Sequence, residues 1–132
     1  SGDDAPRAFR MRQDAHSTAL GKSILANKTN DELKNIYKTY SLYKHTKNTI
    51  TTVDALIKNL NKVKKNGYSI NEAETFDYVN GIGAAILDSE GRAIAGISIS
   101  GTKSTINLKT IPDLSNKVTQ AAKNISKRLR ET

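Results

Sequence analysis

The stretch AIAGISISG, residues 93–101, constrains the fold most, because it predicts a strand with two unlike faces. Side chains alternate from one face to the other along a strand. Ile97 and Ile99 therefore share a face that suits a hydrophobic core. Ser98 and Ser100 share the opposite face, which is too small to fill a core and too weakly polar to favour bulk water. We expect that face to meet either a closely packed helix or a ligand.

A second strand precedes this one across a short turn. The sequence GIGAAILD, residues 81–88, is followed by SEG and then by residues 92–101, a pattern that predicts a β-hairpin. The facing strand is also small, with Gly81 and Gly83 among its residues. Glycines in strands often admit a close helix, and this interpretation stays open. Two hydroxyls on the same side favour a small-molecule pocket, because buried hydroxyls need hydrogen-bond partners.

Helical periodicity predicts four helices around the hairpin. The first helix is expected to begin at Ser17 or Thr18 and the second at Thr29 or Asn30. The third is expected to run from Val53 to Asn66, and the last from Pro112 to about Leu129. The apolar stripe of the third helix contains Val53, Leu56, Ile57, Leu60 and Val63. The apolar stripe of the last helix contains Leu114, Val118, Ala121, Ile125 and Leu129. Helices that cover an antiparallel hairpin predict an α+β fold.

Composition limits the classes of protein to which the chain can belong. Its 132 residues suit one domain, and no run of ~18 apolar residues predicts a membrane span. The absence of cysteine excludes disulfides and thiolate chemistry, and we expect a cytoplasmic protein with no membrane partner. The net charge is +8, and nine lysines lie between residues 28 and 65. Because these lysines are dispersed, a solvated surface is favoured, with a basic nucleic-acid-binding module as the alternative.

Catalytic motifs are absent from the sequence. The two histidines, His16 and His45, lie about thirty residues apart with no supporting motif, and packing or capping explains His16. The letters LGKS resemble the end of a phosphate-binding loop, but His16 stands where that loop needs glycine. Lys22 is expected to be solvated. We therefore expect no enzyme, no catalytic residue, no metal site and no cofactor.

Four stretches occur in the order and spacing of one known family. They are AHSTALGKSILA (15–26), HTKNTITTVDALIKNLNKVKKNGYSINEAE (45–74), AIAGISISG (93–101) and AAKNISKRL (121–129). Together they resemble the effector-binding domain of IclR-type bacterial transcriptional regulators. The resemblance implies a GAF-like domain in which helices flank an antiparallel sheet with an effector pocket. On this basis residues 14–132 are part of the effector-binding domain, and residues 1–13 are the remnant of a strand or linker.

The resemblance also implies seven effector-binding residues: Ala19, Leu20, Gly21, Asn71, Gly81, Ser98 and Ser100. The first three would offer backbone N–H groups, and free amides in a first helical turn favour an anion such as a carboxylate. Asn71 stands where the family often has an acidic residue, and Gly81 where members with carboxylate effectors often have cysteine. The expected effector is a small organic acid.

Further expectations concern partners. The resemblance implies dimers or tetramers, and DNA binding only through an N-terminal winged helix-turn-helix that this sequence lacks. The first helix and strands of the effector domain are expected to precede residue 1. Their absence would leave a sheet edge and apolar surface uncovered, so we expect the chain to self-associate.

Overall fold

The computed structural model describes residues 14–131, and the sequence predictions for residues 1–13 lie outside that range. Its elements, in chain order, are η1 (Ala15–Ser17), α2 (Ala19–Leu25), α3 (Asn30–Thr39), α4 (Val53–Asn66), β1 (Ser69–Glu72), β2 (Asn80–Leu87), β3 (Ala93–Gly101) and α5 (Ile111–Arg130). Among the described helices, none combines the length and apolar character needed to cross a membrane.

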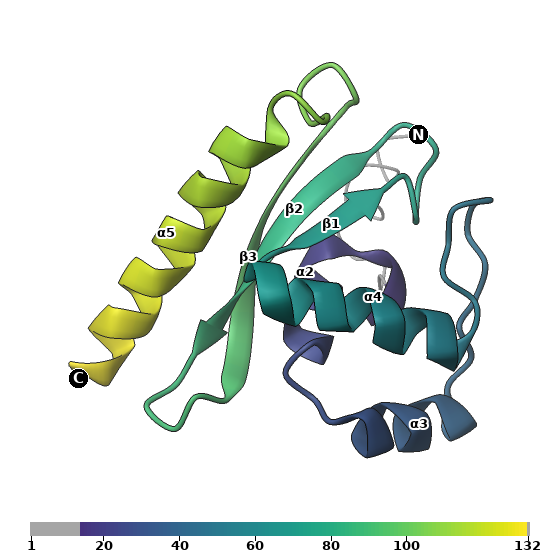
Figure 1. The fold of residues 1–132 in the computed structure, drawn as a ribbon, viewed down its shortest axis with the longest axis horizontal. Coiled ribbons are helices and arrows are strands. Elements are labelled where there is room, and N and C mark those ends of the chain that lie inside the picture. The colour runs from purple at the N-terminus through teal and green to yellow at the C-terminus, as the bar shows by residue number, and fades with distance from the viewer. Residues whose placement is uncertain (1–13, 132) are drawn as a thin grey trace, which may run out of the picture.

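The three strands form an antiparallel sheet in the order β1-β2-β3. The predicted hairpin is confirmed, with Ser98 opposite Gly83 and Ser100 opposite Gly81. The sheet and its flanking helices confirm the α+β class. Figure 1 shows α5 along one side of the sheet and α2, α3 and α4 on the other.

Local sequence signals explain where the helices begin and end. Thr18, Thr29 and Thr52 each cap a helix with a side-chain oxygen that accepts a backbone N–H from the first turn. The Thr29 amide donates to the Glu32 carboxylate, which completes a capping box and lowers the pKa of the Glu32 carboxyl. Helix α4 ends at Gly67, whose φ of 82° is left-handed, a conformation that glycine adopts without a Cβ clash.

Two hydrophobic clusters hold these layers together. The first joins α2, α3 and α4 through Leu25, Ala26, Leu33, Leu56, Leu60 and Val63. The second joins the sheet to α5 through Ile82, Ala84, Ile86, Ile106, Val118 and Ala122, with Ile97 and Ile99 packed against it. The predicted core face of β3 is therefore confirmed. The α4 stripe is confirmed as well, with Leu56, Leu60 and Val63 buried and Val53 and Ile57 half-buried.

The predicted inner face of α5 is partly wrong. Val118 is buried, but Ile125 and Leu129 are exposed, and Ser126 lies inside instead. The Leu87 amide donates to the Ser126 hydroxyl, which itself donates to the Ala122 carbonyl. The small side chains let the helix approach β2 closely and satisfy a strand amide. Apolar periodicity alone does not reveal this preference for a serine.

Removal of the buried Leu60 side chain tests the α4 interface. Leu60→Ala should lower the free energy of unfolding by about 2–5 kcal/mol, because it leaves a cavity in the first cluster. Lys58, Lys62 and Lys65 are exposed on the same helix and serve as controls. Their change to Gln should alter stability by about 0.5 kcal/mol or less each, measured by urea denaturation. A cooperative loss of folding in the lysine variants would contradict this arrangement.

Candidate functional site

One cavity brings together all seven residues selected from the sequence. Its volume is about 620 Å³, and its lining includes Ala19, Leu20, Gly21, Asn71, Gly81, Ser98 and Ser100. Helix α2 forms one wall and strands β2 and β3 form another. The segment after β1 adds Thr75, Phe76 and Val79, which the sequence analysis did not select. The expectation that both serines lie on the hollow side of the sheet, opposite Ile97 and Ile99, is confirmed.

The small residues on this face serve a helix and a cavity at once. A Cβ atom on Gly83 would lie 2.5 Å from the Ala19 carbonyl oxygen, so α2 packs directly on this glycine. A Cβ on Gly96 would lie 3.1 Å from the Leu20 side chain. At Gly81 a Cβ would lie 3.3 Å from the Ala19 side chain and from the Ile99 carbonyl oxygen, and this glycine lines the cavity. The close-helix interpretation is therefore confirmed at Gly83 and Gly96, and the cavity at Gly81 leaves the ligand interpretation as a prediction.

The polar groups of the cavity differ in what they can still bind. Within residues 14–131, no hydrogen bond is found for the hydroxyls of Ser98 and Ser100. The Asn71 side-chain oxygen accepts the Glu74 amide at 2.8 Å, so the side-chain NH₂ is the group that Asn71 can offer. Hydroxyls that donate and accept, beside an amide donor, can orient a small polar ligand.

The first turn of α2 contributes less than the sequence analysis expected. The Gly21 amide donates to the Thr18 hydroxyl at 3.1 Å, so this N–H is already occupied. Ala19 and Leu20 occupy the first two helical positions, where amides have no partner within the helix. Two of the three expected backbone donors therefore remain. The Ala19 carbonyl accepts a hydrogen bond from the buried Ser69 hydroxyl, which holds this turn against β1.

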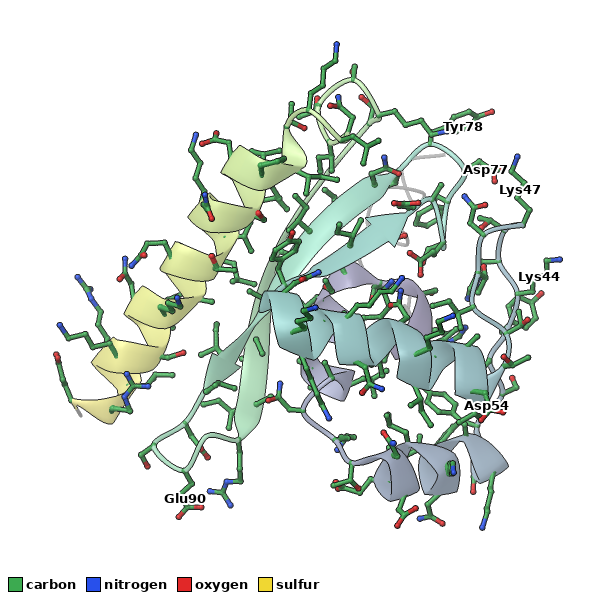
Figure 2. All side chains as sticks on the ribbon, viewed as in Figure 1. Lys44, Lys47, Asp54, Asp77, Tyr78 and Glu90 are labelled. Atoms are coloured by element: carbon green, nitrogen blue, oxygen red, sulfur yellow. The ribbon has the colours of Figure 1, made fainter. Side chains whose placement is uncertain are left out.

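Among residues 14–131, no charged side chain lines this cavity. Figure 2 shows charged side chains such as Lys44, Lys47 and Asp54 projecting from the periphery of the molecule. A ligand in the cavity would therefore meet hydroxyls, amides and apolar walls, and its charge would be met by dipoles rather than by a counter-ion.

Lys22 is the residue that the sequence analysis misjudged most. It is 1% exposed rather than solvated, and its ammonium lies 2.9 and 3.0 Å from the two Glu74 carboxylate oxygens. It also donates to the Ile70 carbonyl at 2.6 Å and to the Asn59 side chain at 3.3 Å. One side chain of α2 thus ties β1, α4 and the segment after β1 together. The local sequence contains no signal for this burial, because the partner carboxylate of Glu74 lies 52 residues away along the chain.

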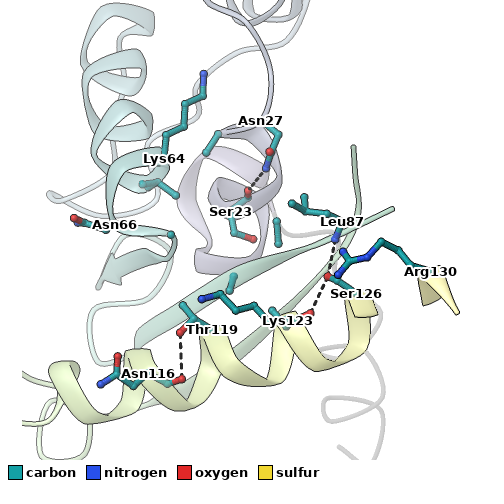
Figure 3. Close-up of a pocket in the computed structure, with 16 residues that line it drawn as sticks. Ser23, Asn27, Lys64, Asn66, Leu87, Asn116, Thr119, Lys123, Ser126 and Arg130 are labelled. Carbon is teal, nitrogen blue, oxygen red and sulfur yellow. Dashed lines mark hydrogen bonds between the residues drawn. The ribbon is translucent and has the colours of Figure 1, made fainter. Parts of the chain in front are cut away.

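A second cavity lies on another part of the molecule. Its volume is about 550 Å³. It lies beside the part of β2 after Gly83, where within residues 14–131 β1 no longer pairs with β2. Figure 3 shows Lys123 and Arg130 of α5 on one wall and Lys64 on the other. None of the seven selected residues lines it, so the cavity beside α2 is the candidate site.

Comparison with known proteins gives a consistent family. Residues 10–127 match the family "Bacterial transcriptional regulator IclR C-terminal". The HTH-type transcriptional repressor AllR of Salmonella typhi is 32% identical over 111 residues, which cover 84% of this chain and 41% of the repressor. The HTH-type transcriptional regulator KipR of Bacillus subtilis is 30% identical over 92% of this chain and 49% of its own length. The chain therefore spans less than half of these relatives, which are regulators rather than enzymes.

Solved structures share the fold. The crystal structure of IclR from Thermotoga maritima is 37% identical, with a TM-score of 0.85 over 90% of this chain and 48% of that one. The inducer-binding domain of the PobR transcription factor from Acinetobacter, solved as a double mutant with 3-hydroxybenzoic acid, has a TM-score of 0.77 over 86% of this chain and 65% of that one. At 22% identity, the second likeness shows the fold alone.

The buried ion pair gives a direct test of how the site is held. Lys22→Met should lower the free energy of unfolding by about 3–5 kcal/mol, because it leaves the Glu74 carboxylate buried without its counter-ion. Lys117→Gln removes one partner of the exposed Asp113–Lys117 pair and should cost about 1 kcal/mol or less. Thermal and urea unfolding measure both variants. Equal costs for the two lysines would mean that the buried pair does not hold the site.

Proposed function

Because this chain belongs to the IclR family of bacterial transcriptional regulators, we propose that it binds a small-molecule effector in the cavity beside α2. The observation that carries the proposal is that all seven residues implied by the family resemblance line one cavity. They come from α2, β1, β2 and β3, so no local sequence pattern required them to meet. The proposed role is that of a sensor within a regulator of the bacterial cytoplasm, not that of an enzyme.

The chemistry of the lining supports a small organic acid as the ligand class. Within the described part of the chain, no acidic side chain lines the cavity to repel an anion, and Asn71 is neutral where the family often has an acid. The amides of Ala19 and Leu20 can meet a carboxylate. Ser98 and Ser100 can meet a hydroxyl or carbonyl on the same molecule. Phe76 and Val79 offer apolar contact, so a carboxylate on a short carbon skeleton fits best.

Regulation then follows from differential binding. A ligand shifts a conformational equilibrium only by its difference in affinity between the states. The ligand would contact α2 and the sheet together, so it would favour the state in which their spacing matches its size. DNA binding is assigned in this proposal to a part of the regulator outside this chain, because the relatives are about twice as long.

A nucleic-acid-binding module is the alternative that the charge suggests. The exposed lysines of α4 could contact phosphates. Membership of the IclR family favours the sensor function over the nucleic-acid-binding module. A titration with duplex DNA at physiological salt distinguishes these two functions. Submicromolar, salt-sensitive binding by this chain alone would favour the module.

Self-association is the second part of the proposal. Strand β3 lies at the edge of the sheet, and within residues 14–131 no strand pairs with its outer side. Ile94 on this strand is 55% exposed, and Ile125 and Leu129 of α5 are also exposed. An unpaired edge beside apolar surface favours pairing with another chain. We propose that a second copy of the chain covers it.

The Ser98 hydroxyl tests the effector site. A thermal-shift screen of short hydroxy- and oxo-carboxylates, with 3-hydroxybenzoate included, first identifies a ligand for the wild-type chain. Ser98→Val should then weaken binding by about 1–3 kcal/mol, because the polar group of the ligand loses its partner. Isothermal titration calorimetry measures the affinity.

The matched control is Ser41→Val, at an exposed serine that lies away from the cavity. It should bind the ligand as the wild type does. Unchanged affinity in Ser98→Val would remove Ser98 from the site.

The sheet edge gives a separate prediction. Light scattering should show a mass above that of the monomer for the wild type, increasing with concentration. Ile94→Lys should shift the mass toward the monomer, because a lysine on an edge strand opposes pairing. Leu108→Lys is the control, since Leu108 is exposed in the loop after β3. A wild-type mass that stays monomeric at every concentration would contradict self-association.

A further inference from the structure

Three potential metal ligands meet at the start of the described chain. Asp14 immediately precedes η1, His16 lies in η1, and His45 comes from the segment between α3 and α4. One ligand atom from each of the three lies within 4.8 Å of the other two. The chain has two histidines in all, and the fold brings both to this place.

The environment of His16 suits a metal ligand. The residue is buried, and its Nε2 lies 2.9 Å from the Tyr43 carbonyl oxygen. A carbonyl can only accept a hydrogen bond, so Nε2 is the donor, and Nδ1 is the nitrogen whose lone pair a metal ion could take. Histidines that bind metals usually donate their other N–H in this way, to a carboxylate or a backbone carbonyl. The contact therefore fixes the tautomer and the orientation of the ring.

His45 and Asp14 form the more accessible half of the cluster. His45 Nε2 lies 2.7 Å from a carboxylate oxygen of Asp14, and the side chains are 26% and 42% exposed. Tyr43 packs edge-on against the His45 ring, with ring centroids 4.9 Å apart. A metal ion can take the place of this hydrogen bond, because an imidazole nitrogen and a carboxylate oxygen can both offer lone pairs to the same centre.

We propose that Asp14, His16 and His45 bind a divalent transition-metal ion, with zinc as the representative. Two imidazoles and one carboxylate suit zinc, cobalt and nickel better than calcium or magnesium, which prefer all-oxygen sites. Bonds of about 2.0–2.2 Å to one ion require the three ligand atoms, now within 4.8 Å of one another, to rearrange around it. Water fills the remaining position, which the exposure of Asp14 and His45 leaves open.

Metal binding at this point would fasten η1 to the segment between α3 and α4. Ala15 of η1 and Thr18 immediately after it line the candidate effector cavity. The ion would therefore hold the approach to α2 in place. The metal site itself depends only on the three ligands and not on the identity of any effector.

Zinc titration of the metal-free 132-residue chain tests the proposal by calorimetry. One equivalent should bind, and His45→Gln and Asp14→Asn should each weaken the affinity at least tenfold. Asp54→Asn is the control, because Asp54 is an exposed carboxylate in the first turn of α4 and lies outside the cluster. This variant should bind zinc as the wild type does. Circular dichroism verifies the fold of each variant, and His16 is left unchanged because its burial makes it part of the packing.

Two further measurements make the outcome decisive. Cobalt should give visible absorption typical of nitrogen and oxygen ligation in the wild type, and this absorption should be lost in His45→Gln. Zinc should shift the ring resonances of both histidines in the NMR spectrum together. Absence of binding, or binding that both His45→Gln and Asp14→Asn retain at wild-type affinity, would overturn the proposal and leave the cluster as an ion pair beside a buried histidine.

Discussion

The structure depends on how closely helix α2 packs on the sheet. Its Ala19 carbonyl lies over Gly83, where any Cβ would collide with the helix backbone. On the same helix, Lys22 extends inward to the Ile70 carbonyl and the Glu74 carboxylate. Close packing fixes the distance between α2 and the sheet, and the ion pair fixes the position of α2 along the sheet. Both constraints act on one short helix, so its first turn occupies a defined place at the cavity.

The segment after β1, which adds residues to the cavity lining, is held in place by two threonines. The hydroxyls of Thr46 and Thr49 donate to the carbonyls of Ala73 and Glu74, each at 2.6 Å. Ala73 has a φ of 53°, an unusual value for a residue with a side chain, so this turn needs support from its surroundings. The segment before α4 thus supports the cavity through hydrogen bonds, although Thr46 and Thr49 do not line it. It positions Glu74, which in turn fixes Lys22 and α2.

Local patterns predicted those features that depend on local physics. Strand alternation assigned Ile97 and Ser98 to opposite faces, and Gly67 marked the end of α4, because both follow from backbone geometry. The burial of Lys22 depends on Glu74, which lies 52 residues away along the chain, so no local sequence pattern can predict it. The inward turn of Ser126 likewise depends on a strand amide. The candidate site was reached through the family resemblance, which supplied long-range pairings that periodicity could not.

The ion pair also determines what kind of selectivity the cavity can have. Lys22 is the positive charge nearest in sequence to the cavity residues of α2, yet Glu74 neutralises it and neither residue lines the cavity. A bound anion would therefore gain nothing from Lys22 and would depend on short hydrogen bonds to amides and hydroxyls inside the cavity. Such bonds are directional and fail when a group is displaced or missing. Discrimination among related acids would then come from the positions of their oxygen atoms relative to Ser98, Ser100 and Asn71, rather than from their net charge.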